Sequence, residues 1–73
     1  MLKGFTVTTD VELQILTSVL YAKDVSYFIH IEEVNGVRYY LVYTPDVENK
    51  EQMDEIYKTF ITVKDMPHLN NKM

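Results

Sequence analysis

Residues 25–44, VSYFIHIEEVNGVRYYLVYT, decide the fold of this chain. They are mostly β-branched and aromatic residues, which favour strands, and Asn35-Gly36 interrupts them once. Asn-Gly is the strongest short signal for a two-residue hairpin turn, because both central residues of that turn need a positive φ angle. The stretch therefore predicts a β-hairpin that turns at Asn35 and Gly36.

A turn at these two residues determines the register of the hairpin. Val34 pairs with Val37, and Glu33 then faces Arg38, an opposite-charge pair that a slip of one residue would destroy. The remaining predicted pairs are Glu32 with Tyr39, Ile31 with Tyr40, His30 with Leu41, Ile29 with Val42 and Phe28 with Tyr43. Because side chains alternate between the two faces of a strand, this register assigns every hairpin residue to a face.

Neither face of the predicted hairpin is polar. One face carries Tyr27, Ile29, Ile31, Tyr40 and Val42, and the other carries Phe28, His30, Glu32, Val34, Val37, Tyr39, Leu41 and Tyr43. We expect the first, more aliphatic set to form the core together with Leu16, Leu20, Ile56 and Phe60. The second set then faces away from the core, where an antiparallel sheet is normally polar. Its aromatic and aliphatic members form a patch that needs a cover or a partner.

A strand and a helix are predicted before the hairpin, and a second helix after it. Residues 2–8 form a short strand, and Thr9 with Glu12 is a capping box that opens a helix ending near Lys23 and Asp24. Asn49 with Gln52 three residues later predicts a second helix cap. Apolar residues follow this cap at helical spacing, namely Met53, Ile56, Tyr57, Phe60 and Ile61. Residues 57–64 are also rich in β-formers, but we favour helix because no turn residue separates them from Ile56.

The predicted architecture is one α+β domain over residues 1–67, followed by a flexible C-terminal tail over residues 68–73. Its element order is strand, helix, strand, strand, helix, with an extra C-terminal strand as the alternative. A right-handed crossover from the first strand to a parallel neighbour places both helices on one face of a three-stranded sheet. A chain of 73 residues has no material for a second core.

Composition argues against several classes of function. The chain has no Cys, which excludes a disulfide framework, a thiol nucleophile and a thiolate metal site. No apolar run approaches the ~20 residues that cross a bilayer, and the first residues do not read as a secretory signal. The net charge is −4, with Arg38 as the only arginine, which disfavours a nucleic-acid backbone or a membrane as partner. We expect a cytoplasmic protein.

No catalytic site is predicted. His30 and Glu32 lie two residues apart on one face and are the one arrangement that resembles a metal or acid–base pair. A third ligand is missing, because the other histidine, His68, lies in the predicted tail. With Gly4 and Gly36 as the only glycines, there is no Gly-rich phosphate loop. We therefore expect a protein that is not an enzyme and uses no metal or other cofactor.

The favoured hypothesis is a small protein-interaction module that acts through the aromatic face of its sheet. It would bind another protein, or its own copy as a homodimer. The predicted interface residues are Phe28, His30, Glu32, Tyr39, Leu41 and Tyr43. A loop, the tail or a last strand that folds over this patch is the alternative without a partner.

Two other functions stay open at this point. An acidic cluster surrounds the start of the second helix, with Lys50 alone opposing it: Asp46, Glu48, Glu51, Asp54 and Glu55. It would suit an inhibitor that docks on a basic, nucleic-acid-binding protein, although carboxylates at a helix N-terminus are also ordinary. Aromatic side chains on an open sheet would suit stacking of single-stranded bases. Against this, the face carries Glu32 in place of a basic groove.

Overall fold

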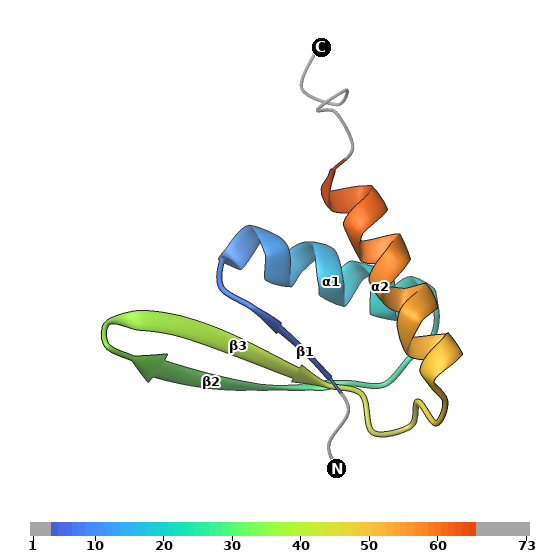
Figure 1. The fold of residues 1–73 in the computed structure, drawn as a ribbon, viewed down its shortest axis with the longest axis horizontal. Coiled ribbons are helices and arrows are strands. Elements are labelled where there is room, and N and C mark those ends of the chain that lie inside the picture. Colours follow the sequence, from blue (N-terminus) through green and yellow to red (C-terminus); the bar gives the residue numbers. More distant parts are fainter. Residues whose placement is uncertain (1–3, 66–73) are drawn as a thin grey trace.

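The computed structural model describes residues 4–65. Five elements follow one another along the chain (Figure 1): β1 (Gly4–Val7), α1 (Asp10–Ala22), β2 (Phe28–Val34), β3 (Val37–Tyr43) and α2 (Lys50–Lys64). The predicted α+β order is confirmed, and residues 57–64 continue a helix and form no last strand. The predicted tail, residues 68–73, lies outside the described residues.

The three strands form one antiparallel sheet in the order β1-β3-β2. β1 and β2 run parallel to each other, but β3 lies between them and pairs with both. The predicted crossover between adjacent parallel strands is therefore wrong, because the returning strand of the hairpin takes the place beside β1. The result is a split β-α-β arrangement, in which α1 carries the chain past β3.

The hairpin is confirmed in its turn and its register. Asn35 and Gly36 have φ angles of 52° and 82°, the positive values that the two-residue turn requires. All seven predicted pairs are present, from Val34 with Val37 to Phe28 with Tyr43. Near the turn, Arg38 Nη2 lies 3.6 Å from Glu33 Oε2.

Both predicted helix caps are also confirmed. Thr9 Oγ1 accepts a hydrogen bond from the backbone N–H of Glu12 at 3.1 Å, and the Glu12 carboxylate reaches back to the N–H of Thr8 at 3.3 Å. At α2, Asn49 Oδ1 accepts from the N–H of Gln52 at 2.7 Å. These bonds satisfy N–H groups that have no partner inside the helix, so they determine where each helix begins.

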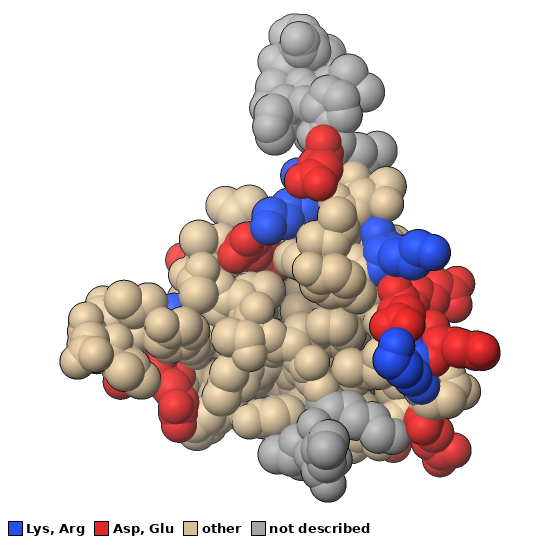
Figure 2. Space-filling view, in the orientation of Figure 1, with Lys and Arg blue, Asp and Glu red and all other residues tan. Residues whose placement is uncertain are grey.

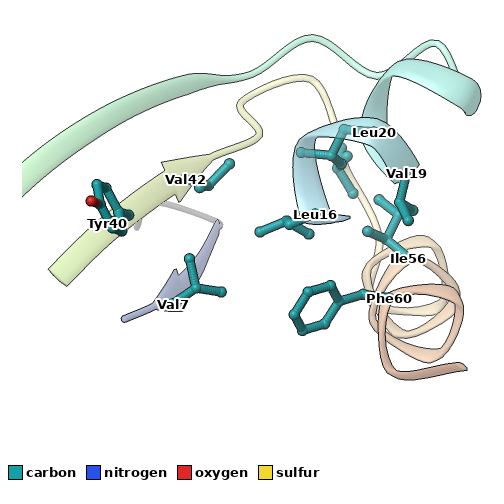
Figure 3. Close-up of a cluster of buried hydrophobic side chains, with 9 residues drawn as sticks. Val7, Leu16, Val19, Leu20, Tyr40, Val42, Ile56 and Phe60 are labelled. Atoms are coloured by element: carbon teal, nitrogen blue, oxygen red, sulfur yellow. The ribbon is translucent and has the colours of Figure 1, made fainter. Parts of the chain in front are cut away.

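The core lies between the two helices and one face of the sheet, the helix face, which carries Val7, Tyr40 and Val42 (Figure 3). The helix residues that the sequence predicts for the core are buried there. The full set of buried hydrophobic residues is Val7, Leu16, Val19, Leu20, Tyr40, Val42, Val47, Ile56 and Phe60. Both helices therefore pack on one face, as predicted.

β2 contributes no buried residue to this core. Tyr27, Ile29 and Ile31 are 39%, 39% and 56% exposed, so their predicted place in the core is wrong. The helices bury residues of β1 and β3 on the helix face, and the tip of the hairpin projects beyond α1 (Figure 1). Alternation of apolar residues identifies a face of a strand, but it does not show how far the helices extend over that face.

Candidate protein-interaction surface

The face of the sheet opposite the helices, the outer face, is made by the hairpin residues that alternate with the core residues. It carries Phe28, His30, Glu32 and Val34 from β2 and Val37, Tyr39, Leu41 and Tyr43 from β3. All six predicted interface residues therefore lie together on one face. Among residues 4–65, no helix or strand covers that face, because both helices pack against the other one.

The outer face is apolar along the whole length of β3. Phe28 and Val37 are 52% and 46% exposed, whereas Tyr39, Leu41 and Tyr43 on the central strand are half-buried by the strands beside them. The rings of Phe28 and Tyr43 contact each other across the two strands, with centroids 5.2 Å apart and planes tilted by 42°. This tilted contact is a favourable arrangement for two aromatic rings, and it orders the end of the face away from the turn.

His30 and Glu32 are the ionisable pair of the outer face. His30 Nε2 lies 3.3 Å from Glu32 Oε2, and the two side chains are 55% and 53% exposed. An ion pair in this exposed position contributes little to stability, since water screens it. In the part of the chain that the structure describes, no three His, Cys, Asp or Glu side chains gather closely enough to hold a metal ion.

A second exposed surface, on the helix face of β2 and of the residue before it, was missed from the sequence. It consists of Tyr27, Ile29 and Ile31, which the helices leave open. All seven residues of β2 are exposed, so this strand presents apolar side chains on both sides of the sheet. A strand that is apolar on both faces is more typical of one buried on both faces, so the pattern alone could not identify β2 as an exposed edge.

The acidic residues before α2 are held outward by a buried anchor. Val47 is 1% exposed and its N–H donates to the carbonyl of Thr44 at 3.2 Å. Thr44 is itself buried, and its hydroxyl donates to Met53 Sδ at 3.6 Å. Because Val47 points into the core, its neighbours Asp46 and Glu48 are exposed.

Lysines accompany the acidic residues of α2. Lys50 Nζ lies 3.3 Å from Asp54 Oδ2, and Lys23 Nζ lies 3.7 Å from Glu55 Oε2. Figure 2 shows carboxylates and lysines side by side over the N-terminal half of α2, at the right of the view. The predicted acidic cluster therefore lies on one side of the molecule, with part of its charge locally balanced.

An open groove of about 620 Å³ lies between α1 and α2 and contains none of the predicted site residues. Its lining includes Ile15, Val19 and Val63, and its one ionisable side chain is Lys23. Lys23 is accompanied in this lining by the uncharged polar side chains of Gln14, Ser18 and Thr59.

Neither helix of the described residues is long and apolar enough to span a membrane. No protein-family model matches the chain, and no curated protein or solved structure matches it.

Proposed function

We propose that this protein is a non-enzymatic interaction module that binds a protein with an apolar surface through the outer face of its sheet. The observation that carries the proposal is a row of apolar side chains, Tyr39, Leu41 and Tyr43, on the face opposite both helices. Burying apolar side chains against a partner is favourable, because each Å² of apolar area that is removed from water lowers the free energy by roughly 25 cal/mol. Apolar patches of this kind on small proteins mark interaction sites.

The charges of the hairpin support a protein partner over a nucleic acid. The ionisable side chains of the outer face are His30 and Glu32, and Arg38 lies on the other face beside Glu33. Single-stranded nucleic acids are bound in basic grooves, because neutralising phosphates supplies most of the affinity. The aromatic side chains are therefore better suited to contact with protein side chains than to base stacking.

The test of this proposal compares two double variants, each of which replaces two tyrosines by alanine on a different surface. Tyr39→Ala with Tyr43→Ala removes aromatic area from the outer face, and Tyr21→Ala with Tyr57→Ala removes it from the helices, where these side chains are 85% and 52% exposed. Proteins captured from the source cell are purified, and their affinity for each variant is measured. We expect the outer-face variant to bind at least about tenfold more weakly, as for an interface hot spot, and the helix variant to bind like the wild type. Equal binding by both variants contradicts the proposal.

A second candidate function rests on the acidic residues near the start of α2. Asp46, Glu48 and Glu51 form no ion pair within residues 4–65, so their charge is open to a basic partner. A small inhibitor of a nucleic-acid-binding protein would use such a surface.

Salt dependence separates the two candidate functions. Glu51→Lys with Glu55→Lys should leave the free energy of unfolding within about 0.5 kcal/mol of the wild type, since both side chains are exposed. A charge-led complex is weakened by this change and by salt, whereas an aromatic contact is nearly indifferent to both. Binding that stays constant from about 0.05 to 0.5 M salt eliminates the acidic surface as the binding site.

A further inference from the structure

We infer that the open edge of β2 pairs with the same edge of a second copy of this chain and joins two sheets into one continuous antiparallel sheet. The inference concerns the backbone edge of the sheet, and it is independent of which protein binds the outer face. It rests on the position of β2, the direction of its free backbone groups and the symmetry of its side chains.

β2 lies at one side of the sheet, and within residues 4–65 no strand pairs with its other edge. The two-residue turn closes with the N–H of Val37 on the carbonyl of Val34, which makes these two residues a hydrogen-bonded pair. Such pairs alternate with non-bonded ones along an antiparallel ladder. The N–H and C=O groups of Ile29, Ile31 and Glu33 therefore point away from β3, toward the open edge.

This edge has little of the protection that exposed strands usually carry. Edge strands are commonly kept from pairing by Pro, charged side chains (Lys above all), a β-bulge or short length; of these features, β2 has the carboxylates of Glu32 and Glu33. β2, FIHIEEV, is seven residues long, contains no Pro or Lys, and pairs with β3 without a bulge. The one charge on its helix face is Glu33, which Arg38 of β3 holds at 3.6 Å. The opposite edge strand, β1, is only four residues long.

The side chains of β2 are complementary to their own copy about Ile31, the middle residue of the strand. A two-fold axis there places Ile31 opposite Ile31 of the second copy on the helix face. On the outer face it places His30 opposite Glu32 and Phe28 opposite Val34, each pair occurring twice. Opposite charges and apolar pairs across strands are both stabilising. Ile29 opposite Glu33 is the one mismatched pair.

Other two-fold registers of the same edge are less favourable. An axis at His30 puts this side chain against its own copy and puts Phe28 against Glu32. An axis at Glu32 puts two carboxylates against each other, and like charges directly opposite are destabilising. The Ile31 register also brings the three residues with free backbone groups opposite one another, so each group finds a partner in the second copy.

The pairing covers apolar side chains that a single chain leaves open. Ile29 and Ile31 on the helix face are 39% and 56% exposed, and Phe28 and Val34 on the outer face are 52% and 49% exposed. An axis perpendicular to the sheet keeps the helices of both copies on one side. The two outer faces then lie side by side as one doubled surface.

Sedimentation equilibrium from about 1 to 500 µM, the range of ordinary interface affinities, is the first test. We expect the wild type to show a monomer–dimer equilibrium within it. Ile31→Lys, which puts a charge at the centre of the edge, should weaken the dimer at least about tenfold. The matched control is Val11→Lys on α1, a position that is 65% exposed and lies outside the strands, and it should dimerise like the wild type. A wild type that is monomeric throughout overturns the inference.

A charge exchange tests the register. Glu32→Lys should weaken the dimer about tenfold, because both His30–Glu32 pairs across the edge lose the carboxylate that faces the imidazole. The double variant His30→Glu with Glu32→Lys restores opposite charges in the Ile31 register and should dimerise within about threefold of the wild type. Failure of the double variant to recover, with its circular dichroism unchanged, rules out this register.

Amide hydrogen exchange separates edge pairing from face-to-face stacking. Dimerisation should slow exchange at Ile29, Ile31 and Glu33, whereas the amides of His30 and Glu32 are already bonded to β3 and should change little. A dimer that leaves the first three amides unprotected overturns the inference. The outer-face variant Tyr39→Ala with Tyr43→Ala should keep this edge pairing. Ile31→Lys should keep the contact with an outer-face partner. Failure of the edge pairing and failure of the outer-face interaction can therefore be told apart.

Discussion

Gly36 shows how one residue sets the register of the hairpin. Its φ angle is 82°, and nothing lies within 4 Å of the place that a Cβ would occupy. A larger residue there would therefore meet backbone strain without a steric clash. We predict that Gly36→Val lowers the free energy of unfolding by about 1–2 kcal/mol, because a β-branched residue resists positive φ. Urea denaturation measures this loss. Asn35→Gly, at the other positive-φ position, is the control and should cost well under half as much; equal losses would argue against the turn.

Asp24 adopts a conformation that glycine usually provides. Its φ angle is 61°, and the backbone bonds from Asp24 N–H to Tyr21 and from Val25 N–H to Leu20 form a Schellman motif at the end of α1. We predict that Asp24→Gly raises the free energy of unfolding by about 0.5 kcal/mol, because glycine adopts positive φ without strain. The neighbouring Lys23→Gly, at a φ of −92°, should be neutral or destabilising. Denaturation midpoints of the two variants that move in the same direction would contradict this explanation.

The elements that could be predicted from the sequence are those whose signals are local. The caps at Thr9 and Asn49 and the turn at Asn35 each act within three or four residues, so the local sequence contains the interactions that form them. The pairing of β1 with β3 and the exposure of β2 depend on contacts distant in the sequence. Ile29 and Ile31 alternate like core residues, and only the strand order shows that they lie on an edge beyond the helices.

For the candidate site, too, the features that depend on local sequence could be predicted, and those that depend on contacts distant in the sequence could not. The six predicted interface residues lie together because the hairpin register alone decides which side chains share a face. The open edge of β2 was missed because it depends on where β1 joins the sheet. Asp10 of α1 accepts a hydrogen bond from the hydroxyl of Tyr40 on β3, another contact that no spacing in the sequence indicates.

An ion pair links the first turn of α1 to the last residue of α2. Lys64 Nζ of α2 lies 2.9 Å from Glu12 Oε2 of α1. This hydrogen bond to Lys64, and after it the bond from the N–H of Thr8, lowers the pKa of Glu12 below its ordinary value of 4.5. The pKa of Lys64 is raised in turn, chiefly by the same bond. The pair therefore makes the contact between α1 and α2 dependent on pH.

The lowered pKa of Glu12 determines how the stability of the fold changes with pH. Because the folded chain holds this carboxylate ionised more strongly than the unfolded chain, its contribution to stability is present above pH 4.5 and is lost as the pH falls through the folded pKa. We predict that Glu12→Gln is less stable than the wild type at pH 7 and that the difference shrinks below pH 4.5. Urea denaturation at a series of pH values measures it, with Glu48→Gln as a surface control. A difference that is constant with pH would show that the loss does not come from the negative charge of Glu12.

The molecule as a whole is thin for its length. The described chain extends over 43 × 33 × 15 Å, with one layer of helices on one layer of sheet. Nine hydrophobic side chains are buried, whereas five apolar residues of the hairpin stay open: Phe28, Ile29, Ile31, Val34 and Val37. A core of this size stabilises a fold by only a few kcal/mol, and the chain has no Cys to supplement it. The free energy gained by contact with another chain is therefore large relative to the free energy of unfolding of the monomer.

Edge pairing of two copies makes the stability of the whole molecule depend on its concentration. A second chain that binds only the folded state raises the free energy of unfolding by mass action, about 1.4 kcal/mol at tenfold excess over Kd. For a domain of this length, each kcal/mol raises Tm by roughly 4–8 °C. We predict that Tm of the wild type rises by several degrees between about 5 and 500 µM chain, as measured by circular dichroism. Tm of Ile31→Lys should stay constant over that range, because its charge blocks the edge while the buried core is unchanged. A wild-type Tm that does not depend on concentration would mean that the edge of β2 remains in water.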